Sequence, residues 1–223
     1  VRKTKVSNLY MPLFYQQNIN QYTRLAVWKI EEAENFFSQT VPLQTPIHHT
    51  HKRLQHFAGR YLLRYLFPSF PYHELEIADT KKPFLPSESF HFSISHCGDF
   101  AAVIVSTKNR VGIDIEIFTE KINKIASKFL HEDEIKNLGI NLFQPNSQQT
   151  ALLTLLWSCK EAVFKWWGNG KVDFSNMIRI QTFTLYNEGI IDVHFKERKL
   201  QLEYKLLDKM YLVWVKTENG NFI

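Results

Sequence analysis

The sequence predicts an α+β fold, because strand-like and helix-like segments follow one another in a mixed order rather than in the regular alternation of a doubly wound sheet. The chain has 223 residues, of which 44% are hydrophobic and 14% are aromatic. This composition supports a buried core and argues against disorder. The length fits either a single domain or one body of two small halves. The boundary between two such halves is best placed near Asn109, between two predicted strands, which gives halves at 1–109 and 110–223.

The first half is expected to hold several strands and one long helix. Residues 48–67 repeat apolar side chains with the 3.6-residue period of a helix that buries one face. Arg53, His56, Arg60 and Arg64 fall on roughly the opposite face, and a solvated face is the simpler interpretation of that basic stripe. The other predicted elements of this half are strands at 10–15, 24–30, 90–95 and 100–106 and a short helix at 31–40.

The second half is expected to begin and end in strands, with two helices between them. A polar loop at 139–147 separates these helices, and Gly168 and Gly170 end the second one. The predicted elements are strands at 111–118, 178–186, 191–195, 199–207 and 210–216 and helices at 122–138 and 149–167.

The formal net charge of +5 permits an acidic partner, although a mildly basic, solvated surface explains it more simply. Cys97 and Cys159 have no cysteine two or three residues away, which argues against a zinc site and favours two free thiols over one disulfide. The start of the chain lacks the apolar run of a signal peptide, and no segment has the length of a membrane span. We therefore expect a soluble cytoplasmic protein without membrane contact.

Two acidic residues lie side by side in the predicted strand 111–118. Strand alternation places Asp114 and Glu116 on one face, beside Gly112 and Phe118, and the apolar residues on the other. Like charges this close repel each other, and a cation between them removes the penalty. Mg²⁺ suits such oxygen ligands. An exposed edge strand with alternating acids is the competing interpretation.

The predicted helix 149–167 is apolar nearly all round except for one polar stripe. At about 100° per residue, the members of this stripe lie close together, and they are Thr154, Ser158, Glu161 and Lys165. Such a helix is largely buried, so we expect its stripe to face a cleft or a bound group. A simple ion pair between Glu161 and Lys165 is the alternative. Lys160 points away from the stripe and is expected at the surface.

The segments FSISH, GIDIE and WSCKEAVFK, in this order, resemble the motifs of the 4′-phosphopantetheinyl transferases. The segments KKPFLP and KRLQHFAGRYLL are similar to that family as well, and the chain length resembles its long, monomeric type. The resemblance implies a pseudo-twofold pair of similar α+β halves with coenzyme A in the cleft between them. It also implies transfer of the phosphopantetheine arm of coenzyme A to a serine of an apo acyl or peptidyl carrier protein, with release of 3′,5′-ADP.

The resemblance assigns a role to each matching residue. Asp114, Glu116 and Glu161 match the Mg²⁺ ligands of the family. The matching coenzyme A contacts are His96 and Lys165 for the pyrophosphate, Lys82 and Pro83 near the adenine, and Arg53 for the 3′-phosphate, and Ser95 is expected to bind coenzyme A as well. Glu161, directly or through a metal-bound water, would take the serine proton, and Lys165 would stabilise the leaving oxygen.

Two other classes of function remain. A metal-dependent nuclease also uses paired acids, a further glutamate and a lysine. Against it, the basic residues are not massed for a duplex, so no nucleic-acid partner is expected. A non-catalytic module that binds coenzyme A or a carrier protein is the second alternative, and the intact acids and Lys165 argue against it.

Overall fold

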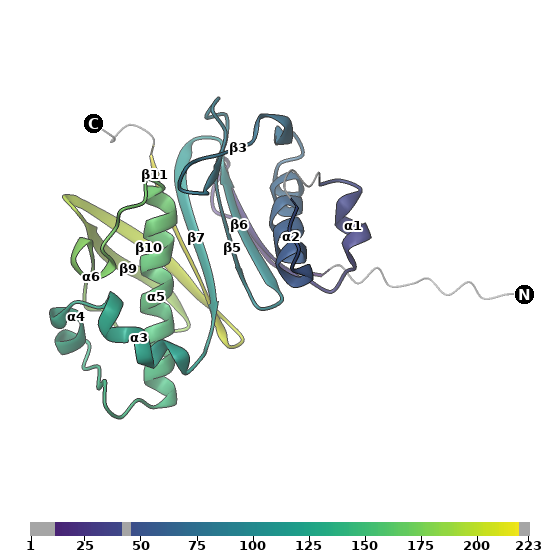
Figure 1. The fold of residues 1–223 in the computed structure, drawn as a ribbon. Coiled ribbons are helices and arrows are strands. Elements are labelled where there is room, and N and C mark those ends of the chain that lie inside the picture. The colour runs from purple at the N-terminus through teal and green to yellow at the C-terminus, as the bar shows by residue number, and fades with distance from the viewer. Residues whose placement is uncertain (1–11, 42–45, 219–223) are drawn as a thin grey trace, which may run out of the picture.

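Two antiparallel sheets lie between two long helices, so that the molecule has four layers (Figure 1). This computed structural model describes residues 12–41 and 46–218. It confirms the predicted α+β class. The beginning of the predicted strand 10–15 and the start of the chain, where no apolar leader was found, lie outside the described residues.

The N-terminal sheet has the strand order β1-β2-β6-β5 and is covered by helix α2 (Thr50–Leu66). This helix forms because its apolar face packs on the sheet, where Phe57, Leu62 and Leu66 are buried in one core with Trp28 and Phe92. The short helix α1 (Glu34–Ser38) packs beside it. The four strands are β1 (Leu13–Asn18), β2 (Thr23–Lys29), β5 (His91–Cys97) and β6 (Phe100–Ser106).

The C-terminal sheet has the strand order β7-β11-β10-β9-β8 and is covered by helix α5 (Ser147–Trp167). Asn146 caps the start of α5, and Gly168 ends it in the left-handed conformation. The strands are β7 (Asn109–Ile117), β8 (Ile178–Ile180), β9 (Glu188–Phe195), β10 (Arg198–Leu207) and β11 (Met210–Glu218). The chain thus enters the second sheet at Asn109, and the division into 1–109 and 110–223 remains a prediction.

The helix predicted for 122–138 is in fact two helices, α3 (Lys121–Phe129) and α4 (Glu132–Asn137). The helix breaks because Leu130 is extended and the next residue, His131, caps α4. The His131 ring accepts from the Asp133 N–H, and the Glu134 carboxylate accepts from the His131 N–H in return. The predicted strand 178–186 is likewise shorter, because only β8 pairs with β9.

A connecting segment between α2 and β5 carries a short helical turn η1 (Tyr72–Glu74) and a small ribbon of β3 (Glu76–Ile77) and β4 (Pro83–Phe84). Pro83 thus lies in a ribbon whose two strands pair over only two residues each.

A third core joins the two sheets face to face. Val111, Ile113 and Ile115 of β7 are buried in it against Leu25 and Ile104 of the N-terminal sheet. The alternate residues of β7 therefore face α5, as strand alternation predicted. Among them, Gly112 permits close contact, since a Cβ there would lie 2.2 Å from the Ala162 carbonyl oxygen of α5. This approach brings α5 onto the acidic face of β7.

Two further expectations can be compared with the structure. Both cysteines are free, with Cys159 buried and Cys97 partly exposed. In the part of the chain that the structure describes, no helix combines the length and the apolar character that crossing a membrane requires.

Candidate active site

Strands β5 and β7 belong to different sheets, and side chains link them. The backbone N–H groups of Ile113 and Ile115 donate to the hydroxyls of Ser93 and Ser95, at 3.2 and 3.4 Å, and the Ile117 N–H donates to the Cys97 sulfur at 3.5 Å. Every second residue of FSISHC thus holds the edge of β7. The hydrogen-bonded side chains bring this edge, with its acids, against the N-terminal sheet.

Asp114 is buried at the centre of this junction, with 1% of its surface exposed. Its Oδ1 atom accepts from Ser95 Oγ at 2.8 Å and from Lys165 Nζ at 2.5 Å. Its Oδ2 atom accepts from Ser158 Oγ at 2.6 Å. The competing interpretation of an exposed edge strand is therefore wrong. The polar stripe of α5 faces Asp114, since both Ser158 and Lys165 bind it.

Glu116 lies two residues further along β7, at the more open end of the junction. Its carboxylate accepts from Cys97 Sγ at 3.2 Å and from the indole N–H of Trp157 at 3.3 Å. Burial and the negative charge of Asp114 raise the pKa of Glu116. Two weak donors therefore hold this carboxylate in place without neutralising it.

Glu161 is the third acid of the group. Within residues 12–41 and 46–218, its side chain makes no hydrogen bond or ion pair. Burial raises its pKa to about 7, the charges of Asp114 and Glu116 add to this, and Lys165 opposes them. The alternative interpretation, an ion pair between Glu161 and Lys165, is wrong, because Lys165 binds Asp114 instead. Glu161 is consequently poised between its charged and neutral forms near pH 7.

Basic side chains lie on the other side of the acids. His96 follows Ser95 on β5 and stays exposed, and the surrounding protein and the charge of Lys165 lower its pKa. Burial, Arg60 and His96 lower the pKa of His56 on α2 to about 4. Arg60 is 8% exposed, and no hydrogen bond or ion pair to another described residue satisfies its guanidinium. The basic stripe of α2 is therefore not a solvated face at Arg60.

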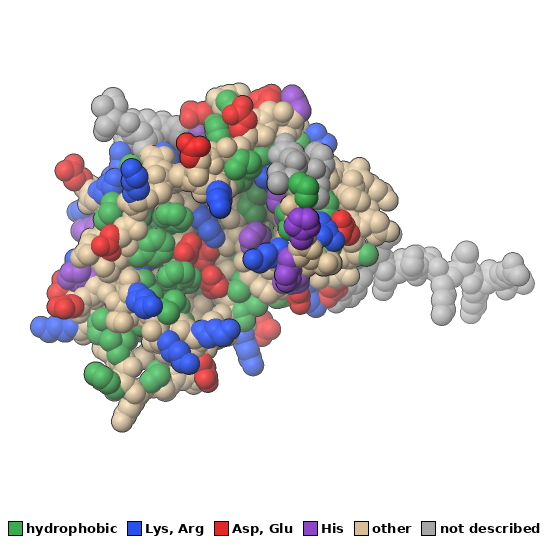
Figure 2. Space-filling view, in the orientation of Figure 1, with side chains coloured by type: hydrophobic (Ala, Val, Ile, Leu, Met, Phe, Trp, Pro, Cys, Tyr) green, Lys and Arg blue, Asp and Glu red, His purple; other side chains and the backbone are tan. Residues whose placement is uncertain are grey.

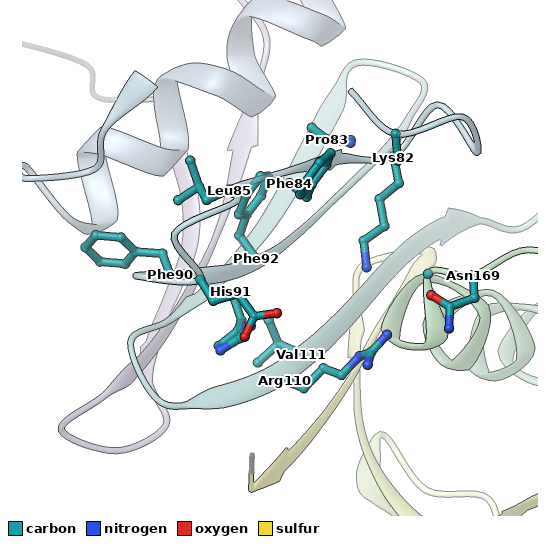
Figure 3. A pocket seen from close by; sticks show the side chains of 13 residues that line it. Lys82, Pro83, Phe84, Leu85, Phe90, His91, Phe92, Arg110, Val111 and Asn169 are labelled. Atoms are coloured by element: carbon teal, nitrogen blue, oxygen red, sulfur yellow. The ribbon is translucent and has the colours of Figure 1, made fainter. Parts of the chain in front are cut away.

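A cavity of about 570 Å³ opens beside this cluster, lined by residues of both sheets and of the connecting segment. Lys82 and Arg110 extend toward one another across it, and Pro83 forms part of its wall (Figure 3). Lys82 also donates to the Lys165 carbonyl at 2.6 Å, and burial lowers its pKa to about 8, helped by Arg110. None of the three acids lines the cavity. Lys82 therefore connects the cavity to α5, the helix that carries Glu161.

Arg53 lies apart from this arrangement. Its side chain pairs with Glu34 of α1 at 2.8 Å and donates to the Ile47 carbonyl at 2.6 Å. These contacts attach the segment before α2 to α1. The predicted 3′-phosphate contact of Arg53 remains a prediction, and it would need a partner able to share or replace Glu34.

The expectation that Lys160 lies at the surface is wrong. Its side chain is fully buried and donates to Glu134 of α4 at 2.7 Å and to the carbonyls of Phe174 and Ile178. Helical angles placed Lys160 away from the polar stripe correctly, but the structure covers that face of α5 with α4 and β8. A buried charge is tolerated there because it is paired and fully hydrogen-bonded.

The donors of this site suit a hard cation in their chemistry. The side chains of Asp114, Glu116 and Glu161 all offer carboxylate oxygens, and their negative charges raise the pKa of the last two. Among the described residues, however, no three His, Cys, Asp or Glu side chains converge closely enough to hold a metal ion. Lys165 neutralises Asp114 instead. The predicted Mg²⁺ site therefore remains a proposal.

Comparison with known proteins gives a family match for the second half of the chain. Residues 110–212, which carry β7, all three acids and α5, match the model of the 4′-phosphopantetheinyl transferase superfamily. This part of the chain is similar to that superfamily.

Three curated members of the superfamily align with parts of the chain. The 4′-phosphopantetheinyl transferase psf-1 of Bacillus pumilus is 43% identical over 82 residues, which are 37% of this chain and 34% of that protein. The 4′-phosphopantetheinyl transferase gsp of Aneurinibacillus migulanus is 33% identical over 118 residues, 53% of this chain and 46% of that protein. The transferase AcpT of Escherichia coli is 30% identical over 117 residues, 51% of this chain and 57% of that protein. The chain thus spans about half or less of these relatives.

The structure adds residues that the motifs of the 4′-phosphopantetheinyl transferases did not single out. Ser158 and Cys97 bind Asp114 and Glu116, and Trp157 donates to Glu116. Ser158 is a member of the polar stripe predicted for α5, although no family motif gave it a role. Only the structure shows that His56 and Arg60 are buried. Nothing in the sequence distinguishes a buried basic residue from a solvated one on the same helix.

The raised pKa of Glu161 predicts a pH-dependent stability of this protein. The folded protein holds the Glu161 proton more tightly than the unfolded chain, so stability is lost as the pH rises from about 4.5 to about 7. Glu161→Gln removes this loss. With a chelator present, we expect its melting temperature to exceed that of the wild type by at least about 2 °C at pH 8, the shift that ~1 kcal/mol produces at this chain length. Below pH 4.5 the two should coincide. A gap that does not change with pH would contradict this assignment.

Proposed function

We propose that the protein transfers the 4′-phosphopantetheine arm of coenzyme A to a serine of an apo acyl or peptidyl carrier protein. One observation carries this function: the charges of Asp114, Glu116 and Lys165 all act on Glu161 at the junction of two sheets, beside a basic cavity. The family motifs and the relatives named as 4′-phosphopantetheinyl transferases support it. We further propose that the protein acts in the cytoplasm as a monomer and requires Mg²⁺.

The transfer exchanges one phosphorus–oxygen bond for another. The serine oxygen bonds to the phosphorus that carries the pantetheine arm, the bond from that phosphorus to 3′,5′-ADP breaks, and the serine loses its proton. Mg²⁺, held by Asp114, Glu116 and Glu161, would offset the charge on the pyrophosphate and the leaving group.

Glu161 is the strongest candidate for the group that takes the serine proton. Its pKa of about 7 matches the pH at which a general base works best, and its carboxylate has no other hydrogen bond among the described residues. Metal binding would lower that basicity, so a water held by Glu161 is the second route for the proton. Lys165, now on Asp114, can place its ammonium group against the leaving oxygen.

The basic residues support binding of the nucleotide end of coenzyme A. Lys82 and Pro83 border a cavity large enough for an adenosine and lie next to α5, through the bond from Lys82 to the Lys165 carbonyl. Ser95 and His96 belong to the strand that borders the acids. Arg60, whose buried guanidinium has no carboxylate partner in the described chain, is better suited to a phosphate than Arg53, which Glu34 already neutralises.

The direct test is a transfer assay on a panel of apo carrier proteins. With coenzyme A and Mg²⁺, the wild type should add about 340 Da, the mass of a phosphopantetheine group, to a carrier of the right kind. Intact-protein mass spectrometry measures this, and omission of Mg²⁺ is the control. The absence of a mass shift with every carrier of the panel would refute the proposed function. Cleavage of DNA under the same conditions would support the nuclease alternative instead.

A further inference from the structure

The C-terminal end of α5 is held by side chains from outside the helix. The chain leaves α5 at Gly168 and continues through a loop to the short helix α6 (Phe174–Met177). The last carbonyl groups of a helix have no partner within it, and here those of residues 165–168 each accept from a distant side chain. The donors are Lys82 to Lys165 at 2.6 Å, Arg110 Nε to Trp166 at 2.7 Å, Arg110 Nη2 to Trp167, and Thr80 to Gly168 at 3.4 Å. The position of this helix end is therefore set by β7 and by the connecting segment.

Arg110 makes two of these four bonds, and it makes them from β7. Its guanidinium also lies over the rings of Trp166 and Trp167, 5.5 and 6.0 Å from their centres. Two residues along the same strand, Gly112 admits the helix backbone, since a Cβ there would lie 2.7 Å from the Trp166 nitrogen. The next residue on this face of the strand is Asp114. One strand thus carries both an acid of the site and the side chain that fixes the end of the facing helix.

Lys165 lies in the last turn of α5, which these contacts hold in place. Its ammonium group binds Asp114 at 2.5 Å from the end of a flexible side chain, so its position depends on the backbone of that turn. Helix ends fray when nothing holds them. Figure 2 shows basic side chains directly above the acidic ones near the middle of the face. In Figure 3, the side chains of Lys82 and Arg110 both end near Asn169, just beyond the helix.

We propose that Arg110 is a positioning residue for the transfer: by holding the last two carbonyls of α5, it places Lys165 where it can meet the leaving oxygen. This role rests on the proposed function. Arg110 also lines the cavity, so direct contact with coenzyme A is the competing role. The geometry points to positioning, because both Nε and Nη2 already donate to α5, and the planar fork of an arginine suits two neighbouring carbonyls.

Replacement of Arg110 separates these two roles. In steady-state transfer assays, Arg110→Met should lower kcat by roughly 10-fold or more, because a misplaced reacting group costs rate. The KM for coenzyme A should change by less than about 3-fold. Arg110→Lys keeps the charge and one donation, so it should recover part of the loss. A raised KM for coenzyme A with an unchanged kcat would make Arg110 a ligand contact and would overturn the proposal.

A second variant shows whether Arg110 acts through Lys165. When Lys165 is already replaced in Lys165→Ala, the addition of Arg110→Met should lower the slow remaining rate by less than about 2-fold. Long single-turnover reactions, followed by the mass of the carrier, measure that rate. A loss as large as in the wild-type background would mean that Arg110 acts by another route, and the proposal would be wrong.

Arg24 offers a matched control in the other half of the protein. From β2 it donates to the Leu66 carbonyl at the end of α2, at 2.9 Å, and it lies over the Phe67 ring, 4.7 Å from the centre. Arg24→Met therefore removes the same kind of contact from a helix end that does not carry Lys165. It should keep kcat within about 2-fold of the wild type. Equal losses of kcat in Arg24→Met and Arg110→Met would show a general structural effect and would overturn the proposal.

Amide hydrogen exchange tests the helix end without any transfer. In Arg110→Met, exchange at residues 165–168 should be faster by roughly 10-fold or more, because local opening of the last turn becomes easier. In Arg24→Met, exchange at these residues should not change. If the wild type transfers to no carrier, the proposed function fails, and exchange then decides by itself whether Arg110 fixes this turn. Equal exchange at residues 165–168 in Arg110→Met and the wild type would refute the positioning role.

Discussion

Glu161→Gln should lower the rate of phosphopantetheine transfer by at least about 100-fold, the usual loss when a general base is removed. Glutamine keeps the shape of the side chain but can neither accept a proton nor carry the charge a cation would need. The melting temperature should not fall, because Glu161 makes no hydrogen bond within the described residues and its charge is unfavourable at neutral pH. Single-turnover transfer, followed by the mass of the carrier, measures the effect.

The control for this variant is Glu197→Gln, a change of the same chemistry at an exposed turn residue. It should transfer at the wild-type rate. If Glu161→Gln also keeps the full rate, Glu161 is neither the base nor a required metal ligand. A large loss that is independent of pH would assign Glu161 to holding the cation, and the proton would then leave through water.

Lys160→Met should be the most destabilising single substitution that the structure predicts. Both members of the Lys160–Glu134 pair are almost fully buried, with 0% and 2% of their side chains exposed. Removing the lysine leaves the Glu134 charge buried without its partner, which typically costs about 3–5 kcal/mol. Denaturant unfolding should show this loss, and at this chain length the melting temperature should fall by roughly 10 °C.

A double-mutant cycle separates the pair from the packing of the methylene chain. Glu134→Gln alone should also destabilise, since the Glu134 carboxylate accepts from the N–H groups of His131 and Ile180 as well as from Lys160. The combination of Glu134→Gln and Lys160→Met should cost clearly less than the sum of the two single changes. Additive losses would mean that the two side chains do not act as a pair.

The spacing of apolar residues was sufficient to predict most of the helices and strands, because the long elements repeat their apolar side chains without interruption. The apolar face of α2 and the alternation of β7 are examples, and both appear in the structure as predicted. The hydrophobic pattern did not predict the break between α3 and α4. The break arises because His131 caps α4 and the Glu134 side chain accepts a hydrogen bond from the His131 backbone. Strand 178–186 was predicted too long, because a strand needs a partner and this segment pairs with β9 only from Ile178 to Ile180.

Part of the candidate site was also accessible from sequence spacing. The stripe on α5 correctly brought Ser158 and Lys165 to the acidic face of β7. The partner of Lys165 was not accessible, because the choice between Glu161 on the same helix and Asp114 on a strand depends on how closely α5 approaches Gly112. The prediction that Lys160 lies at the surface was wrong for the same kind of reason. Its partner, Glu134, is on a different helix, and no local pattern shows that this face of α5 is covered.

The claim that the acids between the two sheets hold a cation for the pyrophosphate of coenzyme A can be tested in a crystal. Mn²⁺ can replace Mg²⁺ in such oxygen sites and gives an anomalous signal. In crystals grown with coenzyme A and Mn²⁺, we predict one strong anomalous peak about 2.1 Å from carboxylate oxygens of Asp114, Glu116 and Glu161. Lys165 should then have moved from Asp114 toward the pyrophosphate. A peak elsewhere, or coenzyme A bound with Lys165 still on Asp114 and no peak at the acids, would contradict this account.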